Sequence, residues 1–374
     1  MSRPDRLHHM DAVRCFCMLF GLMVHGATLA NNWLFDSIQN ASAMFRMAAF
    51  FLVSGFFAAM VASRQPAHAF LANRARLLLV PLAAGLLLLN PITNWLIHWF
   101  HGNPMSLGAW FAGGWRQTVP PPAQPVWHLH LWFLFSLMAY ALLTPGLSRL
   151  AATRPAARLV EVLLRLPAQL RPLALGLAVG AATVALRGLH DQLPAAGGPF
   201  AFIIGATFGY LPFFAIGLWA FRDRRLYDML HAFPWVALAL LGALHLGHSA
   251  IAAGLPHGAE RALYWLARAG FSFSIVVAML ALARRWVTRG SPLLSALTDG
   301  VYSFYIFHFL AIYAIAVAMQ AVTSNVYVIF AVVLLVGYPL LFAIHRRLIA
   351  PHPWMAFLWN GKPMPVRGAR ANQG

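Results

Sequence analysis

Charged residues are scarce in this sequence, and acidic ones most of all. Only 10% of the 374 residues are charged, nine of them acidic, whereas 61% are hydrophobic and the mean hydropathy is +0.69. A soluble domain carries about 25% charged residues. This shortage excludes a soluble globular protein and indicates a polytopic membrane protein.

Cysteine is almost absent, and several enzyme motifs are missing. Cys15 and Cys17 lie two positions apart on one predicted helix, where their side chains cannot face each other. They indicate neither a disulfide framework nor a metal site. The sequence also contains no Gly-x-Ser-x-Gly motif, no Walker motif and no aspartate-rich metal site. These absences disfavour metal-dependent glycosyl transfer, and we expect no metal cofactor.

The few charges are mostly arginines, and they give a net charge of +18. A nucleic-acid partner is disfavoured because the arginines fall in the gaps between apolar runs, as the positive-inside rule describes. Of the 27 basic residues, 22 fall on the side of the membrane that holds both termini. The other five are Arg46, Arg116, Arg187, Arg261 and Arg268. We therefore expect both termini in the cytoplasm. The inner arginines would contact anionic lipid headgroups or a phosphorylated cosubstrate.

The apolar runs predict an all-α bundle of about ten transmembrane helices, with one domain over residues 1–350 and a short cytoplasmic tail over 351–374. The first run follows a basic segment, as in a signal peptide, but His25 and the lack of a clear cleavage site favour a retained helix. The expected spans are 13–32, 43–62, 77–99, 127–145, 172–187, 200–221, 233–251, 262–283, 296–320 and 325–345.

The first span carries the residues that most strongly suggest chemistry. Arg14 and His25 are eleven residues apart, so on a helix they lie within about 20° of each other and about 16 Å apart along the axis. Asp11, one turn before Arg14, is spaced to hold the guanidinium. A titratable ring at membrane depth is costly and usually functional. The alternative is a histidine that serves as packing glue between helices.

The second span offers two further candidates. Arg46 lies near its outer end, either as an outer-face ligand contact or as an interfacial residue whose charged end reaches the headgroups. Ser54-Gly55 is a pair of small residues that allows another backbone to approach closely.

The outer loop over residues 100–125 and the span that follows it also deserve a functional interpretation. The loop is rich in Gly and Pro, ending in Pro120–Pro122, and is long enough to serve as a lid or an acceptor-binding loop. His128 and His130 form an H-x-H pair, but side chains two positions apart diverge on a helix and no carboxylate or cysteine is nearby. We do not interpret this pair as a metal site.

A second intramembrane histidine, His308, follows Tyr302 and Tyr305 in the ninth span. Histidine can act as a general base toward a hydroxyl, and arginines bind phosphates bidentately. Two buried histidines with arginines at the inner ends of spans suit group transfer from a phosphorylated cytoplasmic donor to an acceptor reached from the other side.

Five motifs, in order, resemble the acyltransferase-3 family of membrane acyltransferases over residues 6–365. They are Asp11-x-x-Arg14-x10-His25, Phe50-Phe51-x-x-Ser54-Gly55-Phe56, Arg74-x-Arg76 before Pro81, His130-Leu-Trp132-Phe-Leu134, and Tyr302-Ser-Phe-Tyr305-Ile-Phe-His308. The basic motif departs from the family's frequent R-x-x-R, which leaves the role of each arginine open. Phe45-Arg46-Met47, Tyr210–Gly217 and Gly361-Lys362-Pro363 look most like the branch that attaches succinyl groups to osmoregulated periplasmic glucans.

The resemblance implies ten spans in a bacterial inner membrane, in a monomer or homodimer. It implies an acyl-CoA donor, with succinyl-CoA expected in preference to acetyl-CoA. The implied acceptor is a periplasmic glucan or another envelope glycan. We expect Arg14, Arg74 and Arg76 to bind the coenzyme. His25 acts as general base, or is itself acylated first, with Asp11, Arg14 and His308 as further catalytic residues. The expected substrate-binding residues are Arg46, Ser54, His130, Trp132, Tyr302 and Tyr305.

The roles of Tyr302 and Tyr305 are open at this stage. Hydrogen bonding to the oxyanion that develops on the thioester carbonyl during transfer and plain aromatic packing explain them equally.

Two other classes of protein are alternatives to an enzyme. A transporter also uses intramembrane His and Arg, but the paired broken helices of repeat-built transporters are not found. A purely structural assembly partner leaves His25 and Arg14 unexplained.

Overall fold

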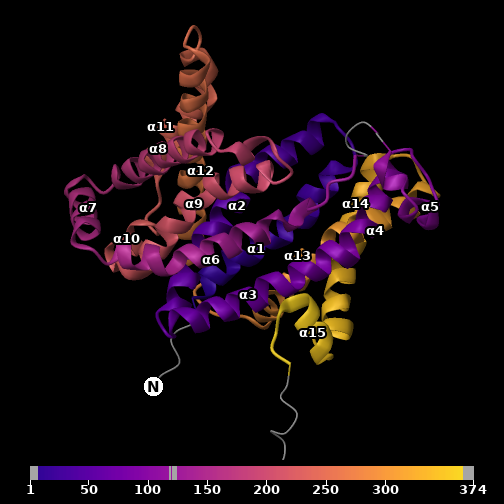
Figure 1. The fold of residues 1–374 in the computed structure, drawn as a ribbon. Coiled ribbons are helices and arrows are strands. Elements are labelled where there is room, and N and C mark those ends of the chain that lie inside the picture. The colour runs from indigo at the N-terminus through magenta and orange to yellow at the C-terminus, as the bar shows by residue number, and fades with distance from the viewer. Residues whose placement is uncertain (1–6, 118, 120–123, 365–374) are drawn as a thin grey trace, which may run out of the picture. The chain divides into compact units, whose positions relative to one another are not determined.

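The computed structural model describes residues 7–117, 119 and 124–364, and these residues contain helices and no strand (Figure 1). The prediction of an all-helical fold is therefore confirmed for the described residues, whereas Pro120–Pro122 lie outside them. The longer helices are α1 (His8–Gly26), α2 (Trp33–Ala62), α3 (Ala67–Ala84), α4 (Asn90–Phe100), α6 (Trp132–Ala151), α7 (Arg154–Arg165), α8 (Arg171–Asp191), α9 (Ala201–Arg222), α11 (Trp235–Ile251), α12 (His257–Trp286), α13 (Pro292–Gln320) and α14 (Val326–Ala343).

Among the described residues, nine helical segments are long and apolar enough to cross a membrane. Each coincides with one of the ten predicted spans. The remaining predicted span, 233–251, is the apolar helix α11, which has 17 residues and stands at the lower limit of about 17 for a membrane crossing. The cytoplasmic position of both termini stays a prediction.

Several predicted boundaries differ from the structure. The first span begins at His8 and not at residue 13, and the second begins at Trp33 and not at residue 43. The third span extends from Ala67 to Phe100, because the basic segment before residue 77 is already helical. The predicted tail contains a short helix, α15 (Pro353–Asn360), whose Trp359 ring packs 4.8 Å from the ring of Phe307. The early start of the third span has a physical reason: the arginines before residue 77 have a high helix propensity, which a prediction from hydropathy does not take into account.

The chain forms two compact units. The first comprises residues 1–17, 40–71 and 139–295, and the second comprises residues 18–39, 72–138 and 296–374. Helices α1, α2, α3, α6 and α13 each contribute residues to both.

In the first unit, α2 and α9 approach each other through glycines. A Cβ atom on Gly55 would lie 2.0 Å from the carbonyl oxygen of Phe214, and one on Gly217 would lie 1.8 Å from that of Leu52. No side chain fits at either distance. The prediction that Ser54-Gly55 admits a neighbouring backbone is confirmed.

In the second unit, α13 is the central helix. Its buried residues Phe304, Phe309 and Ile312 belong to one hydrophobic cluster with residues of α1, α4 and α14. Between α3 and α4 the third span passes through a π-helical segment, Gly85–Leu89. Such segments are frequent at functional sites, and this one precedes two buried asparagines described below.

Candidate active site

Three histidines from distant parts of the chain meet in the second unit. The ring centroids of His130 and His308 are 4.6 Å apart, those of His25 and His308 are 5.1 Å apart, and those of His25 and His130 are 6.3 Å apart. His25 comes from the end of α1, His130 from the 3₁₀ turn Leu129–Leu131, and His308 from α13. The sequence selects all three residues, and the structure brings them together. We call them the histidine cluster.

The tautomer of His308 is fixed by its own helix. Its Nδ1–H donates to the carbonyl oxygens of Tyr305 at 2.7 Å and Phe304 at 3.2 Å. In the neutral ring the lone pair is therefore on Nε2, the atom that can accept a proton. His308 and His130 are 3% and 5% exposed, whereas His25 is only half-buried. Of the three, His25 is the most accessible to a substrate.

The backbone around His130 is strained, and residues of α13 hold it in place. Leu129 has φ +42°, a left-handed conformation that is unusual for a residue other than glycine. The carbonyl oxygen of His130 accepts a hydrogen bond from the Tyr305 hydroxyl at 2.9 Å. The ring of Phe309 stacks on the His130 imidazole at 5.3 Å. These contacts fix the direction in which His130 enters the cluster.

Two buried asparagines of α4 hold the segment that leads to His130. Asn94 exchanges hydrogen bonds with the backbone of Val126, accepting from its N–H at 2.9 Å and donating to its carbonyl at 3.2 Å. Asn90 donates to the carbonyl of Trp127 at 2.8 Å. Sequence reasoning missed both residues, although two amides four positions apart on one face of an apolar span are a recognisable signal.

The tyrosines of the ninth span both donate to backbone carbonyls. Tyr302 donates to Leu77 at 2.9 Å, and Tyr305 donates to His130 at the same distance. Each hydroxyl has one proton, and in this structure that proton is used to position another segment. Of the two alternatives left open by the sequence, these bonds favour a structural role over donation to an oxyanion.

The predicted coenzyme ligands Arg74 and Arg76 lie on α3, in the same unit as the histidine cluster. The Nε–H of Arg76 donates to the carbonyl of Gly361 at 3.2 Å, and its guanidinium also donates to Asn73. Gly361 has φ +61°, and a Cβ there would lie 2.5 Å from the Cα of Leu77. The C-terminal segment is therefore fitted closely against the basic motif.

The remaining predicted site residues belong to the first unit, apart from Trp132. Asp11 and Arg14 form an ion pair at 3.4 Å on α1, and the Arg14 guanidinium lies 5.4 Å from the centre of the Phe57 ring. The predicted Asp11–Arg14 contact is confirmed. Arg46 and Ser54 lie on α2, and Trp132 opens α6 in the second unit.

A second group of arginines lies in the first unit. Arg187 and Arg268 line one small cavity together with Tyr210. The Arg187 guanidinium lies 3.4 Å from the centre of the Trp265 ring. Gly209 leaves room for it, because a Cβ there would lie 2.8 Å from an Arg187 nitrogen.

In the part of the chain that the structure describes, no group of three or more His, Cys, Asp or Glu residues is arranged to hold a metal ion. The acyltransferase-3 family model, described as an acyltransferase domain, matches residues 7–345. No curated protein and no solved structure matches the chain. The family match covers all five motifs and nearly the whole chain, so the protein belongs to the acyltransferase-3 family and is a multi-pass membrane acyltransferase.

Proposed function

We propose that the protein transfers an acyl group from acyl-CoA to a hydroxyl of an envelope glycan, with the reaction taking place at the histidine cluster. The observation that carries this proposal is the convergence of His25, His130 and His308 within 4.6–6.3 Å of one another. Acyl transfer to a hydroxyl needs a base that can give the proton up again, and imidazole is suited to this near neutral pH.

In the proposed reaction His25 accepts the proton of the attacking hydroxyl. The glycan oxygen then bonds to the thioester carbonyl carbon, the C–S bond breaks, and the thiolate of coenzyme A takes the proton from the imidazolium. The alternative is a two-step route in which His25 is acylated first and the glycan hydroxyl then attacks the acyl-imidazole. His308, with its lone pair on Nε2, is the second proton site.

The donor would reach the cluster along α13. Tyr302 contacts Leu77, next to Arg76, while His308 lies six residues further along the same helix, a rise of about 9 Å. Arg74 and Arg76 are the residues we propose to bind the phosphates of coenzyme A at that end, since arginine binds phosphate bidentately. The parts assigned to Arg14, Asp11, Arg46 and Ser54 rest on the sequence motifs alone.

The acyl group is proposed to be succinyl and the acceptor a periplasmic glucan, in a bacterial inner membrane. The support is the resemblance of Phe45-Arg46-Met47, Tyr210–Gly217 and Gly361-Lys362-Pro363 to glucans biosynthesis protein C. Acetyl transfer to another envelope polysaccharide is the nearest alternative for substrate.

The test compares periplasmic glucans from cells with and without the gene by mass spectrometry. Loss of succinyl adducts without the gene, restored by the wild-type gene and not by a His25→Gln variant of equal abundance, supports the whole proposal. Unchanged glucans contradict the acceptor assignment. Purified protein that fails to bind coenzyme A contradicts the enzymatic mechanism and favours a transporter.

A further inference from the structure

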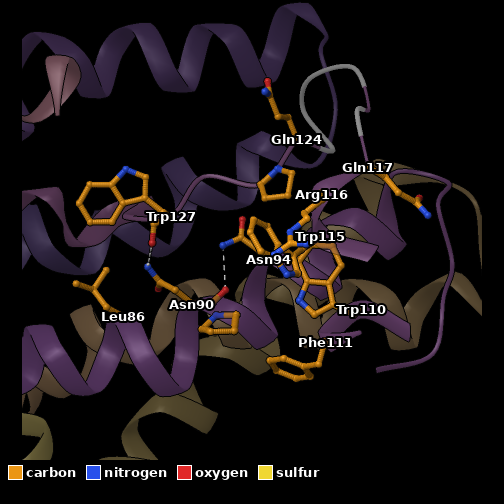
Figure 2. A pocket seen from close by; sticks show the side chains of 12 residues that line it. Leu86, Asn90, Asn94, Trp110, Phe111, Trp115, Arg116, Gln117, Gln124 and Trp127 are labelled. Atoms are coloured by element: carbon orange, nitrogen blue, oxygen red, sulfur yellow. Dashed lines mark hydrogen bonds between the residues drawn. The ribbon is translucent and has the colours of Figure 1, made fainter. Parts of the chain in front are cut away.

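A cavity of about 550 Å³ opens in the second unit, beside the asparagines that hold the His130 segment (Figure 2). Its volume falls in the range of about 300–1,000 Å³ that is usual for small-molecule sites. Helix α4, the short helix α5 (Leu107–Phe111) and the segment before α6 form its walls. The side chains that carry the inference are Asn90, Trp110, Trp115, Gln117, Gln124 and Trp127.

Aromatic rings dominate one part of the wall and stand open to the cavity. Trp115 and Trp127 are 48% and 39% exposed, and the third lining tryptophan, Trp110, is buried at 2%. Indole faces bind the apolar C–H faces of sugar rings, and their electron-rich π-system favours the slightly positive hydrogens. Trp127 lies on the opposite side of the asparagines from Trp115 (Figure 2), so the two exposed indoles can contact separate rings of one extended ligand.

Amide groups supply the polar part of the wall. Gln117 and Gln124 are exposed at the rim of the cavity, and in Figure 2 their amides point outward from the other lining side chains. At the rim each amide can both donate to and accept from the hydroxyls of a sugar. Asn90 also lines the cavity, but it is only 2% exposed, and its amide nitrogen is used to hold the Trp127 carbonyl.

The charge of the cavity favours a neutral ligand. The described lining contains no carboxylate and a single cation, Arg116, whose guanidinium lies 4.9 Å from the centre of the Trp115 ring. That contact is a cation–π interaction. A strongly anionic ligand would need several cations in the lining, and a lipid chain would form no hydrogen bonds with the amides. A neutral ligand with hydroxyl groups fits this lining better than either.

The cavity is linked to the histidine cluster by a short stretch of backbone. Trp127 lines the cavity, and its carbonyl accepts the hydrogen bond from Asn90 (Figure 2). His130 follows three residues later, so the chain between them spans at most about 11 Å. A ligand with two or more linked sugar rings can therefore occupy the cavity and extend toward the cluster.

We infer that this cavity, which we call the tryptophan cavity, is a binding subsite for a neutral, hydroxyl-rich sugar chain. It holds sugar rings that are not themselves being acylated. The inference rests on the proposed function for its role in acyl transfer, but sugar binding itself requires neither acyl-CoA nor His25.

The test is equilibrium binding of a linear, neutral glucose tetrasaccharide to the full-length protein in detergent, measured by calorimetry. We expect the wild type to bind the sugar saturably and Trp115→Ala to weaken the affinity at least tenfold. Adding Gln117→Ala and Gln124→Ala to the Trp115→Ala variant should weaken the affinity further. Trp33→Ala is the matched control, because Trp33 belongs to the same unit, is 77% exposed and lies outside the cavity. It should bind as the wild type does.

Three results would overturn the inference: no binding by the wild type, equal binding by Trp115→Ala, or tighter binding of a galacturonic acid tetrasaccharide. The His25→Gln variant separates this inference from the proposed function. If that variant binds the neutral sugar and retains acyl transfer, the proposed function fails and the subsite stands. If Trp115→Ala shows an unchanged KM for the glycan in acyl transfer, the subsite fails and the proposed function stands.

Discussion

The hydroxyl of Tyr302 donates a hydrogen bond to the carbonyl oxygen of Leu77 at 2.9 Å. In a regular helix that carbonyl would accept from the N–H four residues later, but the residue there is Pro81, which has none. A tyrosine of the ninth span therefore satisfies a backbone group that proline leaves open in the third. The bond joins the helix of the basic motif to the helix that carries His308.

Removing this hydroxyl should destabilise the protein only where the proline is present. Tyr302→Phe leaves the Leu77 carbonyl without a donor, which costs about 1–3 kcal/mol. Pro81→Ala restores a backbone N–H, so Tyr302→Phe should cost clearly less in that background. Thermal unfolding in detergent of the four proteins of this double-mutant cycle measures the difference. Equal costs of Tyr302→Phe in both backgrounds would show that the bond does not compensate the proline.

Adding a methyl group at the α2–α9 contact should prevent tight packing. Gly55→Ala and Gly217→Ala each place a Cβ within 2.0 Å of a backbone oxygen, and overpacking typically costs about 1–3 kcal/mol or more. We expect loss of the monodisperse protein or a strongly lowered Tm. Gly146→Ala is the control, because nothing lies within 4 Å of its Cβ position on α6. Equal stability of all three variants would contradict this packing.

Acid should destabilise the first unit through His231, which lies between α10 (Arg224–Met229) and α11. Burial lowers the pKa of its imidazole to about 4, and its Nδ1–H donates to the Tyr227 carbonyl at 2.7 Å. The unfolded chain, with a pKa of about 6.5, binds more protons between these values. Stability should therefore fall as the pH drops from about 6.5 toward 4, by at most about 3 kcal/mol from this group.

The measurement is the Tm in detergent at pH 7.5 and pH 5, for the wild type and His231→Gln. The variant should lose less stability on acidification than the wild type. The His9 ring lies 5.1 Å from that of His231, so the wild type and the variant are compared with His9 present in both. Identical acid sensitivity in both proteins would refute the assignment to His231.

Loosening the segment before His130 should slow the reaction while leaving donor binding intact. Asn94→Ala removes both hydrogen bonds to Val126, so the segment before His130 keeps only the Asn90 bond to Trp127 as its hydrogen bond from these two asparagines. We expect kcat for acyl transfer to fall at least tenfold, with the affinity for coenzyme A unchanged. Asn103→Ala, whose amide donates only to the nearby His101 carbonyl, is the control. A normal kcat for Asn94→Ala would mean that this support is dispensable.

The sequence was sufficient to predict the helices, because hydrophobic length is a local property that composition records directly. It also selected His25, His130 and His308, since histidine is rare at membrane depth and its presence there needs a reason. Their convergence depends on the packing of α1, α6 and α13, which no local pattern encodes. The motifs of the family link these residues, and the structure supplies the distances.

Other features could not be predicted because they depend on contacts between distant segments. The roles of Asn90 and Asn94 depend on the backbone of Trp127 and Val126, which lie 37 and 32 positions later in the chain. The bond from Tyr302 to Leu77 joins residues 225 positions apart. The need for a glycine at position 85, where the π-helical segment begins, also comes from a distant residue, because a Cβ on Gly85 would lie 2.7 Å from the Leu131 side chain.

The most direct test of the account is single-turnover acyl transfer by purified His25→Gln, compared with the wild type and with Trp33→Ala as a control. General-base catalysis contributes about 10²–10⁴-fold to a rate, so His25→Gln should slow transfer at least a hundredfold while binding coenzyme A and the glycan with wild-type affinity. His308→Gln should slow it as well. Transfer at the wild-type rate by a folded His25→Gln protein would contradict the assignment of the reaction to the histidine cluster.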